Sequence, residues 1–181
     1  SMVAPDRLRF DFSHPSALTQ ADVAAIEREV NAATRAHETV STRLMSPDDA
    51  AEAGALALSG DKFGEEVRVL SMGRKGEGGR TYSVELCGGT HVRATGDIGV
   101  FRIVSESAVS SGVRRIEALT GEAARDWLVA REDALKATAS AIRATPDEVP
   151  ARVLALLDER KKLEKELADA KIGRASCRER V

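Results

Sequence analysis

The first two thirds of the chain alternate apolar and polar residues over short segments, which predicts β-strands. In residues 7–12 every second position is apolar, and this is the period of a strand with one buried face. Further segments with a strand-like pattern are 40–45, 66–72, 81–86, 99–106 and 113–119. A glycine-rich stretch, 73–80, and a serine-glycine turn, 110–112, join neighbouring segments, so we expect antiparallel hairpins there.

Two helices are predicted between these strands. Thr19 is a good N-cap and apolar residues recur at helical spacing after it, so residues 20–35 should form an amphipathic helix packed on the sheet. Ser46 is expected to cap a second, short helix that has Pro47 in its first turn and ends at Gly54.

The last third of the chain has the pattern of long helices. A first helix is expected over 122–144, and Thr145 with Pro146 opens a second one. The second helix carries an apolar stripe with alternating three- and four-residue spacing, made of Val149, Val153, Leu156, Leu163, Leu167 and Ala170. We expect the two helices to pack as an antiparallel hairpin, and the alternative is a seam between two chains.

These patterns predict an α+β fold, a mainly antiparallel sheet packed with helices and followed by a C-terminal helical hairpin. We assign residues 3–119 to the α+β domain and 120–171 to the helical extension. The helical pattern stops at Gly173, and residues 172–181 can be encoded by a DNA sequence that looks like a short-read sequencing adapter. We therefore expect this tail to be non-native, and Cys177 within it to have no function.

Composition narrows the functional classes. Aromatic residues make up 3% of the chain, so base stacking cannot be the main mode of any nucleic-acid contact. The formal net charge of −2 argues against a generally basic surface, and such a contact must be local. Two cysteines without an apolar signal segment indicate a reducing, cytoplasmic compartment, and no apolar run is long enough for a membrane span.

The candidate chemistry lies directly after the strand at 81–86. Cys87 and His91 are separated by Gly88, Gly89 and Thr90, and we expect the glycines to give the tight, positive-φ path that turns both side chains toward one point. Thiolate and imidazole are ligands that zinc prefers, so the pair would supply two of four ligands. The alternative is a small buried cysteine beside a turn histidine.

Other residues are weaker candidates. His14 and His37 are each expected to be a turn, capping or loop residue, with a third metal ligand as the alternative. Arg114 and Arg115 are adjacent on a predicted strand and therefore point to opposite faces. One of them could bind nucleic acid while the other pairs with an acid such as Glu117.

Several motifs in series resemble the editing domain of alanyl-tRNA synthetases. The segments that carry the resemblance are 7–14, 66–73, 84–92, 95–99 and 112–118, and the Cys-Gly-Gly-Thr-His motif is the most distinctive of them. The resemblance spans roughly residues 3–171. Because it covers many motifs in the expected order, it is far more specific than the Cys-x-x-x-His pair alone.

The resemblance implies an α+β domain that hydrolyses tRNA(Ala) wrongly charged with serine or glycine and binds its acceptor end. In that family zinc is held by a His-x-x-x-His pair together with the Cys and His of the second motif, and only Cys87 and His91 match here. The first pair should precede residue 7 by several tens of residues. We therefore expect an N-terminally truncated fragment with an incomplete Zn²⁺ site and impaired activity, and the parent's ligase and ATP-binding activities would lie elsewhere.

The resemblance also gives roles to individual residues. The backbone amides of Gly88, Gly89 and Thr90 could meet a developing oxyanion, and Thr90 is the candidate to sense the serine hydroxyl. Arg114 and Arg115 become candidates for binding tRNA. The catalytic base is not identified.

Four alternatives remain open at this point. They are a threonyl-tRNA synthetase editing domain, a non-catalytic tRNA- or zinc-binding module, a free-standing trans-editing protein, and a helical piece that self-associates or contacts the rest of a synthetase. The Gly-Gly-Thr between the ligands favours the alanyl over the threonyl type, and the helical extension after Gly121 favours a synthetase over a free-standing protein.

Overall fold

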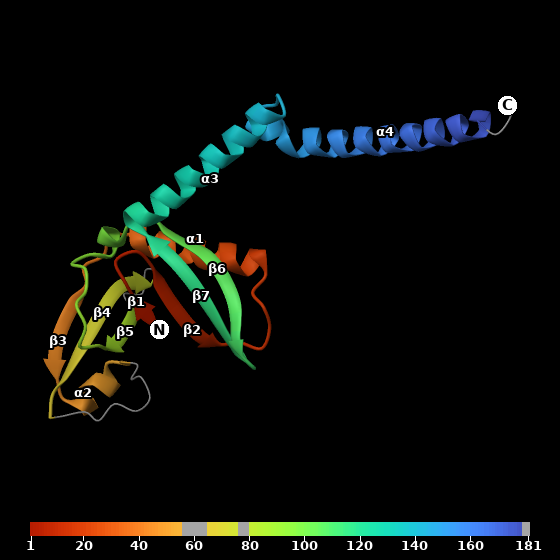
Figure 1. Cartoon of the computed structure of the whole chain (residues 1–181). Coiled ribbons are helices and arrows are strands. Elements are labelled where there is room, and N and C mark those ends of the chain that lie inside the picture. Colours follow the sequence, from red (N-terminus) through yellow and green to blue (C-terminus); the bar gives the residue numbers. More distant parts are fainter. Residues whose placement is uncertain (56–64, 76–79, 179–181) are drawn as a thin grey trace. The chain divides into compact units, whose positions relative to one another are not determined.

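The computed structural model describes residues 1–55, 65–75 and 80–178, with side chains except at 74–75, 80–81 and 172–178. The chain divides into two compact units, Ser1–Asp126 and Trp127–Val181. The first holds all the described strands, and the second is helical (Figure 1). Parts of the predicted 73–80 tip and most of the predicted connection after Gly54 lie outside the described residues.

The first unit contains two antiparallel sheets, where we expected one. The first sheet has the order β1-β2-β7-β6, and the second has the order β3-β4-β5. The strands of the first sheet are β1 (Met2–Val3), β2 (Leu8–Ser13), β6 (Phe101–Ser110) and β7 (Val113–Thr120). Those of the second are β3 (Ser41–Met45), β4 (Val67–Lys75) and β5 (Arg80–Leu86). Both predicted hairpins, β4 with β5 and β6 with β7, are confirmed.

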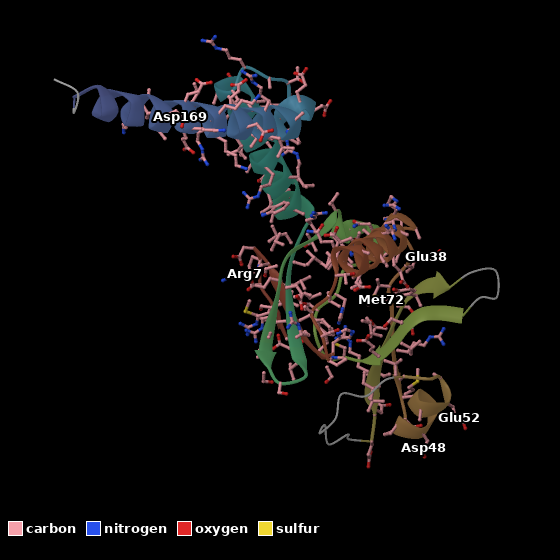
Figure 2. The ribbon with its side chains drawn as sticks, turned by 90° about the vertical axis from the view of Figure 1, so that its right-hand side faces the viewer. Arg7, Glu38, Asp48, Glu52, Met72 and Asp169 are labelled. Carbon is pink, nitrogen blue, oxygen red and sulfur yellow. The ribbon has the colours of Figure 1, made fainter. Side chains whose placement is uncertain are left out.

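The helices of the first unit begin where their capping residues predicted. α1 spans Gln20–Arg35, and the hydroxyl of Thr19 accepts a hydrogen bond from the backbone of Asp22, whose carboxylate in turn accepts from Thr19. α2 spans Pro47–Glu52 and is capped by Ser46. On α2 the labelled acids Asp48 and Glu52 are exposed and point away from the sheet (Figure 2). The expected turn at residues 95–97 is a 3₁₀ helix, η1 (Thr95–Ile98).

Each sheet has its own apolar core. In the first sheet, four buried residues of β6 and β7 pack against apolar residues of β2 and α1. The four are Phe101, Ile103, Ile116 and Ala118. The second sheet packs against α2 through Ala50, Val67 and Val69. Since β4 is covered on its Val69 side and Leu70 is also buried, this strand is a firm base for the loop that follows its partner β5.

Polar side chains tie α1 to β6. The amide of Asn31 donates to the carbonyl of Phe101 and accepts from its N–H, both at 2.9 Å. The carboxylate of Glu27 accepts from the N–H of Ile103 and from Arg102, each at 2.7 Å. β6 is an edge strand, and these hydrogen bonds pair backbone groups on its outer side that no neighbouring strand pairs.

The second unit follows from α3 (Gly121–Ala141), which begins in the first unit, through η2 (Pro146–Glu148) to α4 (Val149–Arg178). Two helices were predicted here and are found, but the expected hairpin packing is not. The leucines of α4 are uncovered, with Leu163 63% and Leu167 56% exposed. An apolar stripe predicts that a face needs burial, but it does not say what covers it.

The backbone of α4 differs from the sequence prediction at Gly173. The helix continues past Gly173 to Arg178, so the break predicted at that glycine is wrong for the backbone. A single glycine lowers helix stability by about 1 kcal/mol and does not by itself end a helix. No helix among the described residues is both long and apolar enough to cross a membrane.

Candidate metal centre

The Cys-Gly-Gly-Thr-His loop begins at the end of β5, where β5 is still paired with β4. Val69 pairs with Leu86, and the N–H of Cys87 donates to the carbonyl of Arg68 at 3.1 Å, so the ladder continues one residue beyond β5. At its far end the loop is fixed by the N–H of Val40, which donates to the carbonyl of Arg93 at 2.9 Å. Two backbone anchors therefore hold the ends of the motif, and the residues between them are free of regular structure.

The structure brings the two predicted ligands together. The Nε2 atom of His91 lies 3.2 Å from the Sγ atom of Cys87. In a tetrahedral centre with a metal–sulfur bond of about 2.3 Å and a metal–nitrogen bond of about 2.1 Å, these atoms would be about 3.6 Å apart. The pair therefore fits a shared zinc ion with a shift of a few tenths of an ångström, and the donor types suit zinc.

The reason for the glycines differs from the predicted one. Neither Gly88 nor Gly89 has a positive φ, so the expected left-handed path is wrong. A Cβ atom at Gly89 would instead lie 3.5 Å from Sγ of Cys87 and 3.7 Å from Nε2 of His91. Both distances are ordinary van der Waals contacts, so Gly89 borders the space beside the two candidate ligands, whereas a Cβ at Gly88 would meet nothing within 4 Å.

The backbone of the loop is accessible. Gly88, Gly89 and Thr90 are exposed, and among the described residues their N–H groups donate no hydrogen bond. Free amides next to a pair of metal ligands can meet an anionic oxygen. The hydroxyl of Thr90 is equally open to a ligand from solvent.

Neither of the two other histidines joins the pair. The ring of His14 donates from Nδ1 to the carbonyl of Ser16 at 2.8 Å and packs against Phe12, which fits the predicted turn role. His37 follows α1 with φ of 52° and packs against Gly96. Within the part of the chain that the structure describes, no group of three or more His, Cys, Asp or Glu side chains could hold a metal ion.

Arg114 and Arg115 lie on β7 of the first sheet, away from the second sheet that carries the loop. Arg115 forms a two-point ion pair with Asp11 at 2.6 and 2.8 Å, and Arg114 forms one with Glu106. The neighbouring guanidinium holds the pKa of each carboxyl below its usual value, mainly through the hydrogen bonds.

The acid predicted to pair with an arginine was the wrong one. Glu117 accepts a hydrogen bond from the hydroxyl of Ser105 at 3.0 Å instead. The role of Arg114 and Arg115 in binding tRNA stays a prediction.

One residue of the site was missed by sequence reasoning. The side chain of Arg68 donates from Nη1 to the carbonyl of Gly89, in the middle of the motif. Counting back from the predicted strand ends, 72 and 81, places Glu66 opposite Cys87, and only the register of the folded hairpin places Arg68 there.

Comparisons with known proteins define the class of this domain. Residues 67–117 match the family described as "Threonyl and Alanyl tRNA synthetase second additional domain". The match includes the candidate ligands Cys87 and His91, Arg68 and both arginines of β7. The first unit therefore contains a second additional domain of this kind.

The nearly full-length matches are more specific. The chain is 68% identical over 171 residues to an alanine--tRNA ligase of Sphingopyxis alaskensis, 65% over 173 residues to that of Rhizorhabdus wittichii and 60% over 172 residues to that of Parvibaculum lavamentivorans. Each match covers 94% of this chain and 19–20% of the relative, so the chain spans about a fifth of the length of these relatives. The chain belongs to the alanyl-tRNA synthetase family, in the region of the second additional domain.

Proposed function

We propose that this region edits: it hydrolyses Ser-tRNA(Ala) and Gly-tRNA(Ala) at the Cys87–His91 pair, in the cytoplasm. The observation that carries the proposal is the 3.2 Å approach of Sγ and Nε2 in an exposed loop of this domain. The need for such a site follows from energetics. A pocket for alanine cannot strongly exclude smaller glycine, nor always reject the added hydroxyl of serine, so a second site must remove the errors.

Cys87 and His91 would hold Zn²⁺ as two of its ligands, with the remaining ligands from outside the residues described here. When bound, the metal would act as a Lewis acid toward the ester or its attacking water. The chain's own contribution is the loop: the amides of Gly88, Gly89 and Thr90 would donate to the oxyanion, and the hydroxyl of Thr90 would bond to the hydroxyl of a serine substrate.

The proposed partner is the acceptor end of tRNA(Ala). With a net charge of −2 and few aromatic residues, the chain offers no broad basic or stacking surface, so the contact would be confined to the neighbourhood of the loop. The ATP-dependent ligation of alanine to tRNA would be carried out by regions of the full-length ligase that this chain does not cover.

The test is deacylation of Ser-tRNA(Ala) by a full-length alanine--tRNA ligase that carries this segment. Cys87→Ala should lower the rate by at least about 100-fold, because losing a ligand should cost no less than losing a residue that only orients one, for which the loss is about 10- to 100-fold. Arg43→Met, an exposed change on the neighbouring strand β3, should leave the rate unchanged. Equal rates in wild type and Cys87→Ala would refute the proposal, and retained zinc without hydrolysis in the wild type would favour the non-catalytic module.

A further inference from the structure

Arg68 contacts the motif from two sides. Its backbone carbonyl accepts from the N–H of Cys87 at 3.1 Å, and its guanidinium donates to the carbonyl of Gly89. One residue thus holds both the start and the middle of the loop. Among the described residues, no other side chain from outside the loop makes a hydrogen bond to residues 87–91.

The register of the hairpin explains how Arg68 can do this. Because Val69 is opposite Leu86, Arg68 and Cys87 form the next opposed pair. Opposed residues in an antiparallel pair have their side chains on the same face, with Cβ atoms about 5 Å apart. The arginine side chain therefore starts next to the cysteine side chain and extends along the loop to Gly89.

The bond to Gly89 acts directly on the ligand geometry. The carbonyl of Gly89 and the N–H of Thr90 belong to one rigid peptide group, so fixing that carbonyl fixes the orientation of the peptide between the two ligands. Gly89 is also the residue whose Cβ position faces both Sγ and Nε2. A rotation of this peptide would change the path from Cys87 to His91.

We infer that Arg68 is a positioning residue for the metal pair: through Gly89 it holds Cys87 and His91 at the separation that a shared ion needs. The inference rests on the proposed function, because it deepens the role of the same site. It assigns to Arg68 no contact with the metal or the substrate.

The experiment uses the 181-residue chain and Co²⁺ alone, followed through the cobalt–thiolate charge-transfer band. Arg68→Met should weaken Co²⁺ binding about 10- to 100-fold, the range for residues that orient metal ligands. Arg68→Lys, which keeps a donor, should recover part of the loss. The matched control is Arg43→Met, which removes an exposed arginine from the adjacent strand and should change nothing.

A second, metal-free readout separates positioning from general stability. Loss of the hydrogen bond should shift the NMR signals of the Gly89 carbonyl carbon and the Thr90 amide in Arg68→Met, while signals of the first sheet stay in place. Unchanged Co²⁺ affinity, or unchanged Gly89 and Thr90 signals, would overturn the role of Arg68. Failure of the metal pair itself would look different, since wild type and Cys87→Ala would then both lack the cobalt band.

Discussion

At the scale of single residues, Gly89 is the position in the loop that lies nearest to both candidate ligand atoms. Gly89 has no side chain at the point where both ligand atoms converge, and its backbone needs no left-handed conformation. A Cβ atom there would make ordinary van der Waals contact with both atoms, so what Gly89 offers is room for a larger group beside them. This differs from the usual reason for glycine in a tight turn, which is backbone freedom.

Substitution of Gly89 tests this reason. Gly89→Val would place methyl groups beside Sγ and Nε2 and should weaken Co²⁺ binding about tenfold or more. Gly88→Val is the matched control, because a Cβ there meets nothing within 4 Å and the residue is equally exposed. Equal affinities for the two variants, measured by titration with Co²⁺, would show that the space beside the ligands is not needed.

At the scale of elements, the first sheet is tied across its strands by two ion pairs, Asp11 with Arg115 and Glu106 with Arg114. Asp11 and Arg115 are directly opposite in the β2–β7 register. Each pair makes two hydrogen bonds, which is the stronger arrangement for arginine and a carboxylate.

These pairs predict an acid-sensitive stability. The folded pKa values of Asp11 and Glu106 lie below the ordinary 3.8 and 4.5. The unfolded chain therefore takes up protons first as the pH falls, so the stabilisation is fully present above the ordinary values and is lost as the pH falls through the lowered ones. Asp11→Asn should make the free energy of unfolding, measured with urea, less steeply dependent on pH below about 5. Exposed Glu122→Gln should not, and equal slopes for all three proteins would contradict the assignment.

Periodicity and capping residues predicted most of the elements, although not the two-residue strand β1 or the 3₁₀ helix η1. Thr19 with Asp22 and Ser46 with Pro47 set the starts of α1 and α2, because these signals act over three or four residues. The division into two sheets and the partner of Arg115 were not predictable in the same way. Asp11 is 104 positions away from Arg115, and only the folded register brings them together.

At the scale of the whole chain, the second unit leaves an apolar stripe on α4 uncovered. Our sequence prediction that this stripe packs against the preceding helix is not met, and the alternative was a seam between two chains. Leu154 is also exposed but does not lie on the stripe. Leu154 can therefore serve as a control for substitutions of the leucines on the stripe.

We expect the isolated chain to self-associate through this stripe. Leu163→Glu with Leu167→Glu should shift sedimentation equilibrium toward the monomer, because charges in a coiled-coil seam oppose association. Leu154→Glu should leave the equilibrium within about twofold of wild type, since it adds the same charge outside the seam. If the stripe and control variants behave alike, α4 is not the seam.

We propose above that Cys87 and His91 act together as metal ligands. The most direct measurement is zinc per chain in a full-length alanine--tRNA ligase that carries this segment, after equilibration with Zn²⁺ and removal of the free ion, for wild type, Cys87→Ala and His91→Ala. We expect zinc bound at this site in the wild type and its loss in both variants. Zinc retained by either variant, or none bound by the wild type, would contradict it.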